Sequence, residues 1–298
     1  MYNWPCITNK IAQKSGKQLD PQSVQAVSGG DINAAFFVGK RLDSLFVKVN
    51  TKARLGMFQA EELGLRSLEK TRSIRVPSVY CTGSCGEHAF IAMQRLNIAL
   101  PPASRTGQSH RQFGHKLAIM HQHTRAKYGA DSDNTIGATP QINEWSEDWY
   151  DFWRKQRLYY QLNLIQKTGT VPASLLDEGY ELGEKMPLLF TDMPVASCLH
   201  GDLWQGNWAF DDHGDALIFD PAHYFGDRET DIAMTRLFGA AHPDFYAAYN
   251  EAYPLSDNYT VRETFYNIYH ILNHYNLFGG SYLNQAQQMI RRVLSEIR

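Results

Sequence analysis

The 298-residue sequence predicts an α+β protein built from two lobes, a small antiparallel sheet with one main helix and a larger, mostly helical lobe. Up to about residue 96, short apolar runs rich in β-branched residues alternate with glycine-containing and charged turns, which is typical of strands. Beyond Pro101-Pro102, apolar residues recur at helical spacing. We therefore divide the chain into an N-terminal lobe, 1–96, and a C-terminal lobe, 97–298. A chain of this length suits two lobes or one large domain.

The N-terminal lobe is expected to hold five strands and two helices. Two turns, Gly29-Gly30-Asp31 and residues 40–43, divide the first strand-like stretch into three strands. The expected elements are, in order, a helix over 7–19, three strands within 24–50, a helix over 57–70, and strands around 77–82 and 88–96 that are joined by the tight turn GSCGE.

The C-terminal lobe is expected to be helical except for two short strands, one around Asp202 and one around Asp220, which we predict to form a β-hairpin. Charged residues on loops that a rigid scaffold holds are the usual places for functional sites. The expected helices cover 108–123, 143–167, 228–240, 243–252, 259–276 and 282–297.

The composition is that of an ordinary soluble globular protein, with 43% apolar and 20% charged residues. Its 29 basic and 31 acidic residues give a formal charge of -2, which offers no general attraction to nucleic acid or to an anionic membrane. No apolar run approaches the roughly 18 residues of a membrane helix. The N-terminus has neither a basic start nor an apolar core, so we expect no secretory signal and a cytoplasmic location.

The four cysteines are Cys6, Cys81, Cys85 and Cys198, and only the middle two are close in sequence. Their CxxxC spacing has no second pair to complete a zinc site. We expect structural or free thiols, and a redox role for Cys81 and Cys85 is the weaker alternative.

The segment LHGDLWQGNWAF, 199–210, places Asp202 and Asn207 five positions apart, and a second apolar run ends at Asp220. Turn chemistry is one explanation, because loops favour Asp, Asn and Gly. The other is a site for phosphoryl transfer from ATP, which needs oxygen ligands for Mg²⁺ and a carboxylate that orients the attacking hydroxyl. The spacing from Asp202 to Asn207 is that of HRDxxxxN in protein kinases. Asp202 is then the base, and Asn207 and Asp220 bind the metal.

The N-terminal lobe supplies the remaining parts of such a site in the expected order. Lys48 lies in LFVKVN, a strand with the lysine between two valines, and Gly29-Gly30 stands between two strands where a nucleotide-covering loop belongs. The following helix offers Glu61, with Glu62 as the second choice, to hold the lysine. Each feature alone is weak, but the ordered set across both lobes predicts a protein-kinase-like fold.

At this point the sequence resembles the fructosamine/ketosamine kinases, which are kin to the aminoglycoside and choline kinases. The similarity spans nearly the whole chain and includes long aromatic segments that phosphoryl transfer itself does not require. The segments that carry it are HGDLWQGN (200–207), PQINEWSEDWYDFWRKQRLYYQLNL (140–164), DPAHYFGDRETDIAMTRLFG (220–239) and LNHYNLFG (272–279).

The resemblance assigns roles to the residues above and adds a few others. Asp202 would deprotonate the sugar hydroxyl, Asn207 and Asp220 would bind Mg²⁺, and Lys48 would contact the ATP phosphates. Trp204 would touch the sugar, with core packing as the alternative. The adenine would bind to the backbone of the inter-lobe segment, which consists of Met93, Gln94, Arg95 and Leu96.

The implied activity is phosphorylation of the 3-hydroxyl of a ketosamine, the sugar adduct that glycation leaves on amines, as a deglycation step. The alternatives are a kinase of another small hydroxyl compound, such as an aminoglycoside, choline or a sugar, and a pseudokinase without turnover. A monomer is favoured. The identity of the sugar, and whether the amine is free or on a protein, stay open.

Two features depart from the family pattern. The family's GHRE is GDRE here, which puts Asp227 in place of a histidine, and no cysteine lies between Gly29 and Lys48 for redox control of the nucleotide loop. We further expect Asp231 to brace the catalytic loop. Of His121 and His123, two positions apart on a helix, one is expected to be packed and the other exposed.

Overall fold

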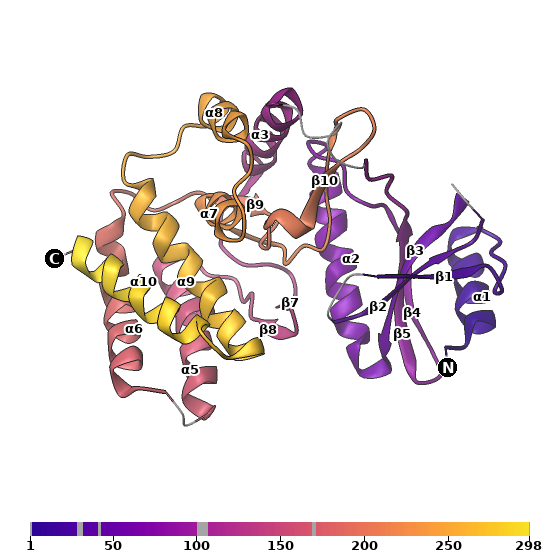
Figure 1. The fold of residues 1–298 in the computed structure, drawn as a ribbon, viewed down its shortest axis with the longest axis horizontal. Coiled ribbons are helices and arrows are strands. Elements are labelled where there is room, and N and C mark those ends of the chain that lie inside the picture. The colour runs from indigo at the N-terminus through magenta and orange to yellow at the C-terminus, as the bar shows by residue number, and fades with distance from the viewer. Residues whose placement is uncertain (1, 29–31, 41–42, 100–106, 169–170, 298) are drawn as a thin grey trace.

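A computed structural model describes residues 2–28, 32–40, 43–99, 107–168 and 171–297 of the chain. Figure 1 shows a sheet flanked by α1 (Trp4–Ser15) and α2 (Leu55–Lys70), next to a larger helical group that ends at the C-terminus. This arrangement confirms the predicted α+β class with a sheet-bearing first part and a helical second part. The boundary at residue 96 stays a prediction.

The sheet of the N-terminal lobe has five antiparallel strands in the order β1-β2-β3-β5-β4. The five strands predicted from the turns and apolar runs are all present. Their bounds are β1 (Val24–Val27), β2 (Ala34–Val38), β3 (Leu45–Thr51), β4 (Val79–Cys85) and β5 (His88–Gln94).

Successive residues of a strand face opposite sides of the sheet, and here each side packs against a different helix. On β3, Val47 and Val49 lie in the core that includes Ile7 and Ile11 of α1. Lys48 lies between these valines and therefore projects to the other side, toward α2. The alternation of the apolar strand thus sets the direction of the one lysine in it.

The helix α1 begins at residue 4, three residues earlier than the sequence indicates. The side chain of Asn3 accepts a hydrogen bond from the Cys6 backbone N–H at 3.1 Å and caps the helix. The helix ends at Gly16, whose φ of +73° is left-handed. It is covalently fixed to the sheet, because Cys6 forms a disulfide with Cys85 at the end of β4.

This disulfide corrects the grouping by sequence spacing, which associates Cys85 with Cys81. The bonded cysteines are 79 positions apart in sequence, with Cα atoms 6.0 Å apart, so spacing alone could not reveal the pair. Cys81 and Cys198 are buried free thiols, and Cys85 is bonded to Cys6 rather than to Cys81. The weaker alternative, a redox role for Cys81 and Cys85, stays a prediction.

The helices of the C-terminal lobe agree with the prediction from residue 228 onward, but the segment from 140 to 190 is more broken than expected. Residues 143–148 are not helical, a π-helical turn over Arg154–Leu158 interrupts the next helix, and α6 (Ala173–Lys185) was not predicted. The other helices are α3 (Gly107–His121), α4 (Trp149–Trp153), α5 (Tyr159–Thr168), α7 (Glu229–Leu237), α8 (Pro243–Ala252), α9 (Tyr259–Phe278) and α10 (Tyr282–Glu296).

The strands around the two aspartates differ from the expected hairpin. The strand before Asp202, β9 (Ala196–Leu199), lies in a three-stranded sheet between β12 (Tyr224–Gly226) and β6 (Thr124–Arg125). The strand before Asp220, β11 (Ala216–Ile218), pairs instead with β10 (Trp208–Phe210). Asp202 therefore lies on a loop between two sheets rather than on a strand of the hairpin. A further pair, β7 (Asn134–Ile136) with β8 (Thr139–Gln141), was not predicted.

The described part of the chain contains no helix that is both long and apolar enough to cross a membrane.

Candidate active site

Lys48 joins the two lobes through a pair of ionic contacts. Its Nζ donates to Glu61 Oε1 of α2 at 2.7 Å and to Asp220 Oδ1, directly after β11, at 2.5 Å. Glu62, the second choice from the sequence, lies one position around the helix and accepts from Arg66 and from the Thr82 hydroxyl. The structure therefore pairs Lys48 with Glu61.

The electrostatics of this group favour a charged lysine. Burial alone would lower the pKa of Lys48, but the Asp220 and Glu61 carboxylates hold it above its ordinary value. Burial raises the pKa of Glu61 despite the nearby ammonium, with a further contribution from the Asp220 charge. One cation is thus shared by two carboxylates, one from each lobe.

The loop after β9 has a geometry that only glycine permits at position 201. Gly201 has a φ of +84°, and a Cβ there would lie 2.0 Å from the Ala222 carbonyl oxygen. The buried Asp231 of α7 holds this loop. Its carboxylate accepts hydrogen bonds from the backbone N–H groups of His200 at 2.7 Å and Gly201 at 2.8 Å. Asp231 is 1% exposed, so it braces the loop from the interior, as expected.

Asp202 and Asn207 are held together by the loop that connects β9 to β10. The Asn207 side-chain amide donates to the Asp202 backbone oxygen at 2.9 Å and to its Oδ2 at 3.0 Å. Burial, followed by the nearby Asp220 charge, raises the pKa of Asp202 to about 7. A carboxyl with this pKa is poised to accept a proton near neutral pH.

Asn207 lies next to both aspartates, because its side-chain nitrogen also approaches the Asp220 backbone oxygen at 3.4 Å. Because the Asn207 nitrogen is used as the donor, its Oδ1 has no hydrogen-bond partner within the described residues. Asp220 adopts a φ of +57°, a left-handed conformation that aspartate tolerates better than most residues. An amide oxygen and a carboxylate are ligands that suit a hard divalent cation.

No group of three or more His, Cys, Asp or Glu side chains forms a metal site within the described ranges. A cation of the magnesium type takes one or two protein ligands and completes its shell with phosphate oxygens and water. The residues present therefore fit such an ion only together with a phosphate-bearing substrate.

Gly29 and Gly30, which the sequence predicts to cover a nucleotide, lie outside the described residues. Asn50 of β3 donates to the Ile32 carbonyl at 3.0 Å and to the Asn33 side chain at 2.7 Å, which ties residues 32 and 33 to the sheet.

The inter-lobe segment after β5 leaves backbone groups for a ligand. Met93 is buried against α2, and Arg95 stacks its guanidinium over the Phe37 ring at 3.9 Å. The backbone N–H and C=O of Leu96 have no partner among the residues that the structure describes. A nucleobase edge hydrogen-bonds to free backbone groups of this kind.

Trp204 lies two residues after Asp202 and is 37% exposed. Its ring meets Phe238 edge-on at 6.3 Å, and a Cβ at Gly206 would lie 2.2 Å from it, so only glycine lets the ring occupy this place. Trp204 is therefore a partly exposed aromatic side chain near Asp202 in sequence rather than a core residue.

The aromatic segment 140–164 supports the loop that carries Asp220, a function that its sequence did not reveal. Gln141 donates to the Ala222 carbonyl at 3.0 Å, and Asn134 donates to the His223 carbonyl at 2.8 Å. Arg157, on the π-helical turn, is fully buried with its guanidinium 4.3 Å from the centre of the Tyr224 ring. The segment 220–224 is thus held by residues of the C-terminal lobe.

Two histidines considered from the sequence have structural or peripheral positions. His121 is buried and contacts Asp231 and Tyr249, whereas His123 is exposed, as expected. His223 and Tyr224, which follow the loop of Asp220, are both buried, and burial lowers the pKa of His223 to about 4.

Asp227, which replaces the family's histidine, lies in a buried ionic network that the sequence did not predict. It accepts the Tyr266 hydroxyl at 2.5 Å, and its neighbour Glu229 accepts two hydrogen bonds from Arg262, at 2.7 and 2.9 Å. Burial, and then the Glu229 charge, raise the pKa of Asp227 to about 7.

Comparison with known proteins identifies the group to which this site belongs. The family model described as fructosamine kinase matches residues 3–296. The chain belongs to the fructosamine kinase family. It is 40% identical over 293 residues to the "Probable ketoamine kinase" of Synechocystis, with 98% of this chain and 97% of that protein covered. It is 38% identical to the chloroplastic protein-ribulosamine 3-kinase of Arabidopsis thaliana, covering 95% of this chain and 86% of that protein.

Solved structures agree with the family and extend the fold. The crystal structure of the "Putative fructosamine-3-kinase" of Haemophilus somnus has a TM-score of 0.88 at 30% identity and covers 98% of this chain and 97% of that one. The aminoglycoside phosphotransferase APH(4)-Ia, at 14% identity, covers 98% of both chains with a TM-score of 0.65 and shows the shared protein-kinase-like fold. As a member of this kinase family, the protein is an ATP-dependent phosphotransferase that acts on a hydroxyl group.

Proposed function

We propose that the protein transfers the γ-phosphoryl group of ATP to the 3-hydroxyl of a ketosamine, as a step in deglycation. The observation that carries the proposal is the contact of Lys48 with both Glu61 and Asp220, next to the Asp202–Asn207 pair. These groups stand in the order and relation that phosphoryl transfer requires. The names of the relatives supply the acceptor, because they are ketoamine and ribulosamine kinases.

In this proposal Asp202 orients the acceptor hydroxyl and takes its proton. Lys48 binds the ATP phosphates, and this contact replaces its contact with Asp220. Glu61 keeps the ammonium in place. Asn207 and Asp220 would hold Mg²⁺, which neutralises charge on the phosphates when bound. Catalysis then depends on positioning and on electrostatic stabilisation rather than on a covalent intermediate.

We assign the adenine to the backbone of the segment from Met93 through Gln94 and Arg95 to Leu96, and the loop of Gly29 and Gly30 to the phosphates. Trp204 offers an aromatic face to the sugar or to its amine, supported by its exposure and by its position two residues after Asp202. Whether the sugar is fructose, ribulose or erythrulose, and whether the amine is free or on a protein, is decided by the substrate panel below.

We further propose that the enzyme acts as a monomer in the cytoplasm. The five residues of the proposed site come from a single chain, so no second copy is needed to complete it. Size-exclusion chromatography with light scattering tests the monomer, and cell fractionation tests the compartment.

The test is to incubate the protein with Mg-ATP and ribulosyl-lysine, fructosyl-lysine, erythrulosyl-lysine, a glycated protein, an aminoglycoside or choline, and to record ADP release. We expect turnover on one or more ketosamines alone. Turnover only on the aminoglycoside or choline would refute the deglycation role but leave the assignment as a kinase intact. If no acceptor leads to ADP release although ATP binds, the protein would be a pseudokinase.

The role of Asp202 has a separate test. Asp202→Asn keeps the size of the side chain and removes the proton acceptor, so turnover should fall at least 100-fold, in the range typical of general-base removal. Binding of ATP should survive. Near-normal turnover of this variant would show that Asp202 is not the base.

A further inference from the structure

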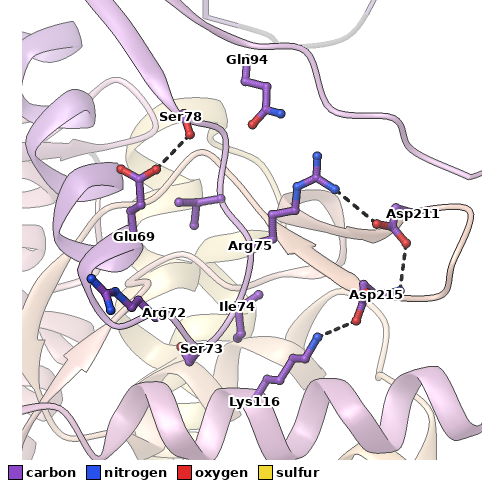
Figure 2. Close-up of a pocket in the computed structure, with 11 residues that line it drawn as sticks. Glu69, Arg72, Ser73, Ile74, Arg75, Ser78, Gln94, Lys116, Asp211 and Asp215 are labelled. Carbon is purple, nitrogen blue, oxygen red and sulfur yellow. Dashed lines mark hydrogen bonds and ion pairs between the residues drawn. The ribbon is translucent and has the colours of Figure 1, made fainter.

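A pocket of about 410 Å³ lies where the two lobes meet, away from the proposed catalytic residues (Figure 2). Its walls come from the end of α2 and the segment that follows it, from the end of β5, from α3 and from the β10–β11 turn. The polar residues that line it are Glu69, Arg72, Ser73, Arg75, Ser78, Gln94, Lys116 and the Asp211–Asp215 pair. None of Lys48, Glu61, Asp202, Asn207 or Asp220 lines it.

The β10–β11 turn fixes the two cations on one side of the pocket. Arg75 contacts Asp211 through one nitrogen at 3.3 Å, and Lys116 contacts Asp215 at 2.6 Å. The two aspartates are themselves linked, because Asp211 accepts the Asp215 backbone N–H at 3.0 Å. A guanidinium has five N–H donors and an ammonium has three, so both cations keep free donors after these contacts.

The opposite side of the pocket has an acid without a cationic partner. Glu69 accepts the Ser78 hydroxyl at 2.9 Å and forms no ion pair within the described ranges. Arg72 also lines this side, but Figure 2 shows its guanidinium directed away from Gln94 and Arg75. Figure 2 shows the Gln94 amide directed into the space between Ser78 and Arg75, and this amide has no hydrogen-bond partner in the described part of the chain. The pocket therefore offers an acceptor at one end and donors at the other.

These charges select the chemical class of a ligand. An anion alone would meet Asp211 and Asp215 beside the cations, and a cation alone would meet Arg75 and Lys116 beside the acids. A small zwitterion avoids both conflicts, with its ammonium on Glu69 and its carboxylate on Arg75 and the Gln94 amide. The only apolar lining residues, Ile74 and Val76, are 4% and 5% exposed and offer little surface to an apolar peptide anchor.

The pocket also touches the elements that carry the proposed catalytic groups. Glu69 lies on α2, the helix of Glu61. The Arg75 carbonyl accepts the Ile218 backbone N–H at 3.0 Å, two residues before Asp220. A ligand there would link the ends of α2 and β5 in one lobe to α3 and the β10–β11 turn in the other, and would fix their relative position.

We propose that this pocket binds a free α-amino acid and that its occupancy changes the affinity of the enzyme for ATP. By linkage, ATP changes the affinity for the amino acid by the same factor. The inference concerns a binding site, so it can be tested in a protein that shows no ketosamine turnover.

The test is isothermal titration calorimetry of the full chain with each of the twenty L-amino acids. Lactate, ethylamine and inorganic phosphate serve as ligands that carry only one sign of charge. At least one amino acid is expected to bind with a Kd of about 1 mM or tighter, and the single-sign ligands at least about tenfold more weakly. The titrations are repeated with a saturating non-hydrolysable ATP analogue, which should shift the Kd about fivefold or more.

The variants Glu69→Gln and Arg75→Gln each remove one charged end of the pocket and should weaken binding at least about tenfold. Arg111→Gln is the matched control, because Arg111 lies on the same helix as Lys116 but pairs with Glu251 on the surface. Unchanged thermal unfolding of each variant shows that it is folded.

Three results would overturn the proposal. One is that no amino acid binds, and another is that lactate or phosphate binds as tightly, which would make the pocket an anion site. The third is that binding survives Glu69→Gln but is lost in Trp204→Ala, which would place the amino acid in the catalytic cleft. An unchanged Kd in the presence of the ATP analogue would overturn the coupling between the two sites.

Discussion

The disulfide between Cys6 and Cys85 gives the most quantitative prediction. It closes a loop of 79 residues, from α1 to the end of β4. For a loop of this length, the entropy that the cross-link removes from the unfolded chain corresponds to about 4.5 kcal/mol at 25 °C. Cys6→Ser should therefore lower the free energy of unfolding by up to about this amount, and the Tm by about 10 °C.

The assay is thermal unfolding of the wild type and of Cys6→Ser, each with and without dithiothreitol. Reductant should lower the Tm of the wild type to that of the variant and leave the Tm of the variant unchanged. The variant thus controls for effects of the reductant other than cleavage of this disulfide. In denaturant, the oxidised wild type should titrate two thiols, Cys81 and Cys198, and the reduced protein four. Four thiols without reductant, or equal Tm values throughout, would refute the reasoning.

Three further predictions concern the site and its support. Glu61→Gln removes one charge-assisted hydrogen bond from Lys48, worth about 1.5–3 kcal/mol, so kcat/KM for ATP should fall about 10- to 100-fold. The control Glu62→Gln should change kcat/KM little, because Glu62 contacts Arg66 instead. Equal effects of the two substitutions would contradict the pairing of Lys48 with Glu61. Gly201→Ala places a Cβ 2.0 Å from the Ala222 oxygen at a left-handed φ, so turnover should be lost and the Tm should fall. A variant with normal turnover and Tm would refute the stated loop geometry. Asp227 has its pKa raised in the folded state, so its contribution to stability is present at low pH and is lost as pH rises toward 7. Asp227→Asn should therefore gain Tm relative to the wild type between pH 5 and pH 8, and a difference that does not change with pH would count against the raised pKa.

The sequence predicted the lobes and most elements because their patterns are local. The alternation around Lys48 and the turns between strands required no knowledge of distant residues. The five-residue spacing from Asp202 to Asn207 likewise expresses the local geometry of one loop.

What could not be predicted depends on contacts between distant parts of the chain. The disulfide partner of Cys85 is 79 positions away in sequence. The strand β9 pairs with β12, which lies further along the chain, rather than with β10, the strand that follows it. The hydrogen bond from Gln141 to the Ala222 carbonyl spans 81 positions, so the sequence of the aromatic segment did not reveal that it supports the loop of Asp220. The pocket of Figure 2 is equally non-local, because its lining is drawn from both lobes.

The contact between Lys48 and Asp220 has a consequence for the form in which the nucleotide binds. Lys48 is shared by Asp220 and Glu61, so in the proposed assignment a phosphate competes with Asp220 for the ammonium while Glu61 keeps its contact. The Asp220 carboxylate, 45% exposed, would then be available to a divalent cation. We therefore expect the metal–nucleotide complex to bind more tightly than either component alone.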